Sequence, residues 1–172
     1  MTFVRVKHIA GQDYAYLVEN YWTDKGSRQR AKKYLGRVHT FPRTQTHFFD
    51  NNPKQFSDLI TQLCRIELLN HGFAITDDPH KFGRDEIIID LTSGKMTKNN
   101  KNITLQCNEG FLCQDTYLAL RDFSPTTASE FKLELVNALL GAGVQIQPDQ
   151  FITIYEACKE KINKPTAARE ET

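Results

Sequence analysis

Residues 14–38 read YAYLVENYWTDKGSRQRAKKYLGRV, and this stretch decides the fold of the N-terminal part of the chain. Its first segment, Tyr14–Trp22, is rich in Tyr and Val, which favours a strand. Residues 23–27 then supply turn chemistry, with Gly26 suited to a positive φ angle. Arg28–Val38 suits a strand or a short helix. We predict a strand, with Gly36 at its frayed end, because the turn returns the chain alongside Tyr14–Trp22.

Toward the N-terminus, residues 2–9 alternate apolar and basic side chains, and this alternation predicts another strand. Gly11-Gln12-Asp13 supplies the turn between these two strands. Residues 1–41 are therefore predicted to form a basic three-stranded antiparallel sheet. A polar linker over residues 42–53 follows it.

Toward the C-terminus, the sequence predicts an α+β body over residues 54–162, with two or three strands and about four helices. Strands are expected at 86–91, where a continuous apolar run suggests burial on both faces, and at 103–107, with a polar hairpin turn at 95–102 between them. Four helices are expected, at 53–72, 112–123, 130–140 and 148–162. The first is predicted to begin at Pro53 with Asn52 as its N-cap and to end at residues 70–72. The helix at 130–140 is preceded by a capping box at 127–130. Residues 163–172 are expected to be a flexible tail.

The composition is that of a globular protein, since 40% of the 172 residues are hydrophobic and 25% are charged. No apolar run is long enough for a transmembrane helix. The first residues already alternate like a strand and lack the apolar stretch of a secretory signal, so we expect the protein in the cytoplasm. Reduced, buried thiols are favoured over a structural zinc, because no C-x-x-C pair occurs among the four cysteines, Cys64, Cys107, Cys113 and Cys158.

Positive charge is concentrated in the first quarter of the chain. Residues 1–43 hold nine Lys or Arg and three acids, a balance of +6, whereas the whole chain carries +1, so the remainder carries −5. Between Lys25 and Arg43 no acid occurs. Such a split suggests a basic contact module on a mildly acidic body.

Strict alternation along Arg28–Val38 places Arg28, Arg30, Lys32 and Tyr34 on one face of the predicted strand. The three cations would then lie about 7 Å apart along a line. Phosphates along one nucleic-acid strand repeat at a similar spacing, so this ridge is predicted to contact a phosphate backbone. The predicted binding residues are the cations of the sheet and two aromatic side chains suited to stacking on a base: Arg28, Arg30, Lys32, Lys33, Arg37, Arg5, Lys7, Lys25, Tyr34 and Trp22.

Two interpretations without a binding role stay open for these residues. Basic residues on a strand are often only the solvated face of a small sheet. Tyr14, Tyr16 and Trp22 share a face of their strand, and their use as the core of the sheet is favoured over a stacking platform.

Three segments of this region resemble the N-terminal segment of insertion-sequence transposases of the IS4-like group: residues 14–21 (YAYLVENY), 26–30 (GSRQR) and 34–38 (YLGRV). They are also similar to uncharacterised archaeal proteins that open in the same way. The resemblance covers residues 3–38 and implies contact with nucleic acid. In those transposases an RNase-H-like catalytic domain with three acidic residues follows. The rest of this chain is too short and differently arranged for that domain, so transposition is not expected.

Acidic residues gather in sequence around the strand predicted at 86–91, as they would in a metal-dependent nuclease: Asp77, Asp78, Asp85, Glu86 and Asp90. Such a site also needs a second acid and a lysine on the neighbouring strand, which offers Gln106, Asn108 and Glu109 but no lysine at the required spacing. The histidines have no Cys or Ser arranged beside them as a nucleophile pair. Gly141-Ala142-Gly143 closes a helix and does not cradle a phosphate. We therefore predict no enzyme, no bound metal and no cofactor.

The sequence thus predicts a non-catalytic nucleic-acid-binding protein, with DNA favoured over RNA. Three alternatives stay open: a factor that binds ribosomal or other RNA, a protein-interaction module and, as a minor alternative, a metal-dependent nuclease. A protein partner or a second copy of the chain would bind through the C-terminal body. No membrane partner is expected.

Overall fold

Nine strands form one mixed sheet in the computed structural model, which describes residues 2–47, 55–124 and 131–163. The α+β class and the four helices are confirmed within these residues, whereas the prediction of three strands plus two or three more is wrong. In chain order the elements are β1 (Thr2–Ile9), β2 (Gln12–Thr23), β3 (Gly26–Thr40), α1 (Phe56–Asn70), β4 (Ala74–Ile75), β5 (Lys81–Arg84), β6 (Ile87–Asp90), β7 (Lys95–Lys98), β8 (Lys101–Cys107), β9 (Gly110–Leu112), α2 (Gln114–Arg121), α3 (Phe131–Gly141) and α4 (Pro148–Asn163).

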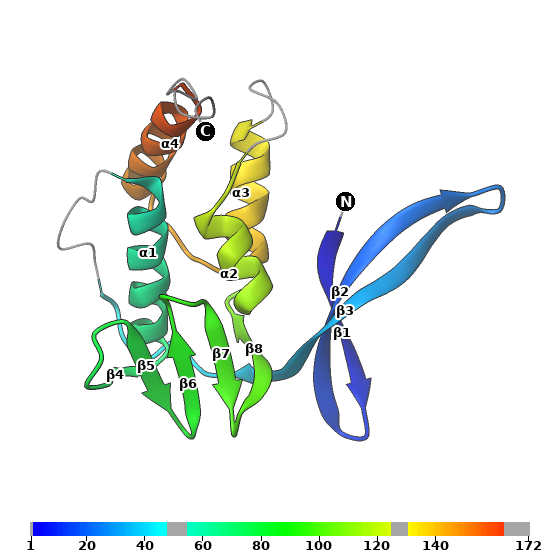
Figure 1. Cartoon of the computed structure of the whole chain (residues 1–172), viewed down its shortest axis with the longest axis horizontal. Coiled ribbons are helices and arrows are strands. Elements are labelled where there is room, and N and C mark those ends of the chain that lie inside the picture. The colour runs from blue at the N-terminus through cyan, green and yellow to red at the C-terminus, as the bar shows by residue number, and fades with distance from the viewer. Residues whose placement is uncertain (1, 48–54, 125–130, 164–172) are drawn as a thin grey trace, which may run out of the picture.

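The first three strands form the expected antiparallel meander. β1 pairs with β2, and β2 pairs with β3 from Tyr14↔Arg37 to Thr23↔Gly26. The last residues of β3 run parallel to β8, so the sheet continues into the C-terminal strands in the order β1-β2-β3-β8-β7-β6-β5-β4, with β9 also paired to β8. Figure 1 shows the β2–β3 hairpin extending far out from the helices, to the end of the molecule opposite α1 and α4.

Two β-bulges interrupt the alternation of β3. The register with β2 shifts twice, and each shift leaves one extra residue in β3, Lys32 and Leu35. Gly36 follows the second extra residue and has a φ of +123°, and a Cβ added there would lie only 2.7 Å from the Cα atom of Ile103 in β8. Gly36 is therefore a buried bulge residue that lets β8 approach, and its prediction as a frayed strand end is wrong.

Short strands explain why the sheet is larger than predicted. β5, β7 and β9 have four, four and three residues, in stretches where the sequence indicates a loop, a hairpin turn and a turn from a strand into a helix. A strand with one exposed face accepts polar residues, which hides β7 from a pattern search. Ile88 is 44% exposed between the buried Ile87 and Ile89. The burial on both faces predicted for this run is therefore wrong.

The four helices lie together beside strands β4–β8 (Figure 1) and enclose the main core with them. Leu59 and Ile60 of α1, Tyr117 of α2 and Ile154 of α4 are fully or almost fully buried there. The helix predicted at 148–162 is found at Pro148–Asn163. The caps predicted at Asn52 and at 127–130, the first-turn Pro53 and the tail after Asn163 lie outside the described residues.

Candidate nucleic-acid interface

One face of the β1–β2–β3 sheet collects cations and tyrosines, and we call it the outer face. Residues paired directly across antiparallel strands project to the same side of the sheet. The pairs of β2 with its two neighbours therefore place six such side chains together: Arg5, Lys7, Arg37, Tyr14, Tyr16 and Tyr34. Among the described residues of these three strands, no acid falls on this side.

The three tyrosines of the outer face pack against one another. The ring centroid of Tyr34 lies 5.4 Å from that of Tyr16 and 6.3 Å from that of Tyr14. Lys7 Nζ lies 5.1 Å from the Tyr16 centroid, a cation–π geometry. Tyr34 remains 50% exposed. Partial burial, followed by the neighbouring Tyr14 and Tyr16, raises the pKa of Tyr34, so its hydroxyl stays protonated and can donate to a phosphate oxygen.

The single ridge predicted for Arg28, Arg30, Lys32 and Tyr34 is not formed. Arg28 and Arg30 pair with Tyr21 and Glu19 and project to the opposite side of the sheet, which we call the inner face. Tyr34 belongs to the outer face, because a bulge sets two residues of one strand against one residue of its partner and so reverses the alternation beyond it. Alternation read from the sequence alone carries no sign of this reversal.

Acidic side chains neutralise much of the inner face. Arg30 Nη2 and Lys32 Nζ lie 3.3 Å and 3.4 Å from the same Glu19 oxygen, and hydrogen bonds from first Arg30 and then Lys32 lower the pKa of Glu19. Lys33 Nζ lies 2.8 Å from Oδ1 of Asp115 at the start of α2. Exposed ion pairs of this kind contribute little to stability, because water screens them. These cations are therefore compensated in charge without being held rigidly.

The inner face also packs against the body. Ala15 and Leu35 are buried together with Cys113, the residue before α2, and Val4 and Leu17 pack around them. This small core explains why the sheet has one covered side and one solvent side. It leaves the outer face as the side available to a large ligand.

The end of the β2–β3 hairpin is largely exposed. Trp22 is 82% exposed and Tyr21 is 42% exposed, so the interpretation of Trp22 as a core residue is wrong. Lys25 and Arg28 are also exposed. Among the described residues neither of these two cations, nor Arg37, has an ion-pair partner.

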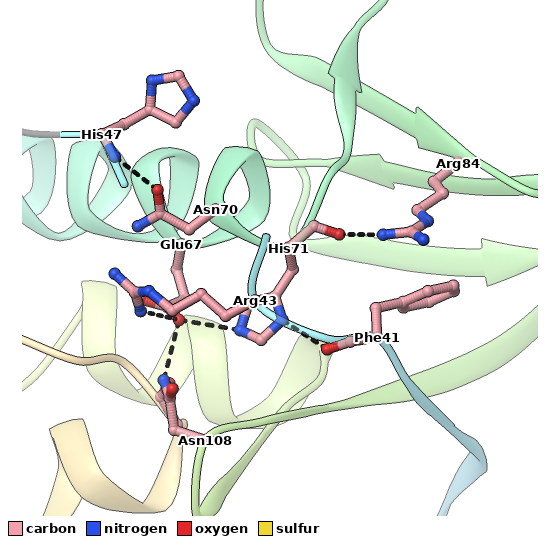
Figure 2. Close-up of polar contacts among 9 residues, drawn as sticks. Phe41, Arg43, His47, Glu67, Asn70, His71, Arg84 and Asn108 are labelled. Atoms are coloured by element: carbon pink, nitrogen blue, oxygen red, sulfur yellow. Dashed lines mark hydrogen bonds and ion pairs between the residues drawn. The ribbon is translucent and has the colours of Figure 1, made fainter. Parts of the chain in front are cut away.

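A second polar cluster lies inside the body around Glu67 of α1 (Figure 2), whose side chain is 2% exposed. Glu67 Oε1 accepts hydrogen bonds from Asn108 Nδ2 at 2.9 Å, and from Arg43 Nη1 and His71 Nε2 at 3.0 Å each. His71 Nδ1 donates to the Phe41 carbonyl oxygen 2.7 Å away. Burial raises the pKa of Glu67, but the hydrogen bonds from His71 and Asn108 and the charge of Arg43 outweigh burial and hold this pKa below its usual value.

This cluster fastens the chain after β3 to α1. The backbone N–H of His47 donates to Asn70 Oδ1 at 2.7 Å, and the guanidinium of Arg84 lies 4.3 Å from the Phe41 ring centroid (Figure 2). The described part of the predicted linker, residues 42–47, is therefore docked on the helix. We assign the cluster a structural role because its polar groups contact one another. The spacing of Glu67 and His71, four residues apart in a helix, was the sequence signal for it, and our sequence reasoning missed it.

Acids near β6 have local structural roles. Asp90 Oδ1 accepts from the backbone N–H groups of Thr92 and Ser93, and its Oδ2 accepts from Ser93 Oγ, so this carboxylate closes a turn. Asp85 and Glu86 form the β5–β6 turn with positive φ angles. In the described ranges, no three His, Cys, Asp or Glu side chains gather closely enough to hold a metal ion. The prediction of free, buried cysteines is confirmed for all four.

Comparisons with protein-family models, with curated proteins and with solved structures find no match to this chain. The resemblance of residues 3–38 to transposase N-terminal segments accordingly stays a prediction. Within the described helices, none combines the length and apolar character that crossing a membrane requires.

Proposed function

We propose that this chain is a non-catalytic nucleic-acid-binding protein whose outer face contacts the phosphate backbone. The observation that carries the proposal is the gathering of Arg5, Lys7 and Arg37 with three tyrosines on a face where no described strand residue is acidic. Cations that neutralise phosphates release condensed counterions, and this release supplies most of the non-specific affinity of nucleic-acid-binding proteins.

The spacing of these groups suits a polyanion. Arg5 and Lys7 stand two residues apart on β1, about 7 Å along the strand. Arg37 lies two strands away, opposite Tyr14, so the three cations surround the tyrosine cluster. The exposed ring of Tyr34 offers a surface for an unstacked base, and its hydroxyl can donate to a phosphate oxygen.

The inner face is proposed to contribute less. Arg30, Lys32 and Lys33 already face carboxylates of Glu19 and Asp115. Arg28 and Lys25, which have no ion-pair partner among the described residues, extend the positive surface toward the hairpin end. Residues 1–43 carry a charge balance of +6 and the rest of the chain carries −5. This uneven distribution should steer a polyanion toward the N-terminal sheet.

The salt dependence of binding tests the proposal. Affinity for a fluorescent 16-base-pair duplex, a length that we choose for the assay at roughly one and a half helical turns, would be measured by anisotropy over a range of salt concentrations. Three phosphate contacts predict a slope of log K against log salt of about −2.7. Replacing Arg5, Lys7 and Arg37 together by Ala should flatten this slope by about one per lost contact and weaken binding at low salt.

A charge-matched variant provides the control. Lys95, Lys101 and Lys159 are exposed cations of the body, and their joint replacement by Ala changes the net charge by the same amount. We expect this control to keep nearly the full slope. A salt-independent affinity, or equal losses in the two triple variants, would contradict phosphate binding by the outer face.

A further inference from the structure

The β2–β3 hairpin continues past β1 as a ribbon of two strands. β1 makes its last described pair with β2 at Thr2↔Glu19. Four more β2–β3 pairs follow, from Asn20↔Gln29 to Thr23↔Gly26. We call residues 20–29 the ribbon end. At about 3.3 Å per residue it projects roughly 13 Å beyond the three-stranded part.

These dimensions match one feature of duplex DNA. The major groove of B-form DNA is about 12 Å wide and 8.5 Å deep and admits a two-stranded β-ribbon. The two backbones of the ribbon end lie about 4.8 Å apart, and the ribbon projects further than the groove is deep. An RNA duplex is different, because its major groove is too deep and narrow for side chains to read.

The side chains of the ribbon end can form hydrogen bonds with the edges of bases. Asn20 and Gln29 lie directly opposite each other on the outer side of the ribbon, whereas Arg28, opposite Tyr21, lies on its inner side, so a ribbon that enters a groove end-first presents such groups on both of its faces. Asn and Gln side chains pair with adenine in the major groove, and Arg pairs with guanine. Asn20, Arg28 and Gln29 are all exposed. Asp24 is the one acid of the segment, and a carboxylate in the groove accepts from the amino group of cytosine.

The ribbon end is tied to the outer face. Arg5 Nη1 donates to Gln29 Oε1 at 2.6 Å, which fixes the amide with its oxygen engaged and its NH₂ group available as a donor. A duplex seated on Arg5, Lys7 and Arg37 therefore lies next to Gln29. Trp22 projects from the same side of β2 as Tyr14 and Tyr16, at the free end of the ribbon.

We propose that the ribbon end enters the major groove of duplex DNA, where Asn20, Arg28 and Gln29 contact base edges while the outer face holds the flanking phosphates. This inference rests on the proposed nucleic-acid binding and adds its substrate class, double-stranded DNA. It also assigns two layers of contact, in which the outer face supplies affinity and the ribbon end supplies sequence preference.

Trp22 is the only tryptophan of the chain, so its fluorescence reports directly on the ribbon end. The full-length protein would be titrated with a DNA duplex, an RNA duplex of the same sequence and the single DNA strand, with Trp22 emission and anisotropy recorded together. A random-sequence duplex library would supply the preferred sites. We expect affinity for the DNA duplex to exceed that for the RNA duplex by about tenfold or more, with a change in Trp22 emission on the DNA duplex.

Two variants separate the layers of contact. Arg28→Ala should lower affinity for an enriched duplex by about tenfold and affinity for a scrambled duplex by much less, because only the general attraction of its charge is lost there. Lys95→Ala removes an exposed cation from the body and should change neither affinity. Far-UV circular dichroism would confirm that both variants keep the sheet.

The outcomes distinguish this inference from the function on which it rests. Equal binding to DNA duplex, RNA duplex and single strand, with no enriched sequence and unchanged Trp22 emission, would overturn groove entry. A steep salt slope in that same experiment would leave phosphate binding standing. Tighter binding to the single strand would replace groove reading by stacking on the tyrosines. Failure to bind any of the three would overturn both proposals.

Discussion

Tyr34 lies directly opposite Tyr16, with ring centroids 5.4 Å apart, although an alternation counted from Arg28 assigns it to the face of Arg28 and Arg30. The bulge at Lys32 causes this difference, because it reverses the facing of the residues beyond it, and the bulge at Leu35 reverses the facing again before Arg37. The bulges therefore decide which residues of β3 share a face. The outer face carries cations without acids among its described strand residues, and the inner face carries cations compensated by Glu19 and Asp115.

Removal of Glu19 should strengthen nucleic-acid binding. This carboxylate contacts both Arg30 and Lys32, so Glu19→Gln releases two cations and removes a repulsive charge. We expect affinity to rise about threefold to tenfold at low salt, with a steeper salt dependence. Fluorescence anisotropy on a labelled duplex measures both quantities. Asp13→Asn, at the far end of the β1–β2 hairpin beside His8, is the matched control, and an equal rise in that variant would rule out a specific role for Glu19.

Gly36→Ala should destabilise the junction between β3 and β8. The φ of +123° at this position strains any L side chain, and a Cβ would overlap the backbone of Asn102 and Ile103. We expect a loss of about 3 kcal/mol or more in the free energy of unfolding. Gly26→Ala has a similar φ of +100° with open space around it and should cost about 1–2 kcal/mol. Urea denaturation measures the free energy of unfolding of both variants. Equal losses in the two would show that the close approach of β8 to Gly36 adds nothing to the cost of the substitution.

The buried Glu67 should make the stability of the body depend on acid pH. Its pKa is held below the ordinary value of 4.5, so its contribution is complete above that value and is lost as the pH falls through the lower folded pKa. Glu67→Gln should lower the free energy of unfolding at neutral pH by about 3 kcal/mol and flatten its decline as the pH falls below 4.5. Glu109→Gln, at an exposed position of the β8–β9 turn, should leave both the stability and the pH profile unchanged. An unaltered profile in the Glu67 variant would contradict the role assigned to the cluster in Figure 2.

The four cysteines should be inert in the folded protein. Burial raises the pKa of Cys107 to about 12 and likewise raises the pKa of Cys64, Cys113 and Cys158. Because the thiolate is the reactive form, a thiol reagent at neutral to mildly alkaline pH should label none of them until denaturant is added, when all four should react. Rapid labelling of any one in the native state would indicate an accessible thiol and a different local packing.

The sequence predicts the long elements well and the short ones poorly. β1 and α4 are found within one residue of their predicted bounds, because an alternating run and an apolar helical face are strong signals. β5, β7 and β9 are too short for any periodicity, and the parallel pairing of β3 with β8 joins segments more than sixty residues apart. Long-range pairing of this kind leaves no local trace in composition or spacing.

The candidate site was predictable in its residues and not in its geometry. Arg5, Lys7, Arg37 and Tyr34 were selected for their charge, their residue type and their places in predicted strands. Their meeting on one face depends on the bulges at Lys32 and Leu35. The first bulge has no sequence signature, and the second is marked only by Gly36 inside the strand. The Arg30–Glu19 and Lys33–Asp115 contacts likewise depend on side-chain positions that only the folded sheet defines.

Mapping the bound surface residue by residue tests the central claim most directly. Amide chemical shifts of the isotope-labelled full-length protein would be recorded while a short DNA duplex is added. Phosphate binding by the outer face predicts that the largest changes fall on β1, β2 and β3 around Arg5, Tyr16, Tyr34 and Arg37, with α1 and α4 nearly silent. Changes confined to the body, or none at all at concentrations where other polyanion-binding domains are saturated, would contradict it.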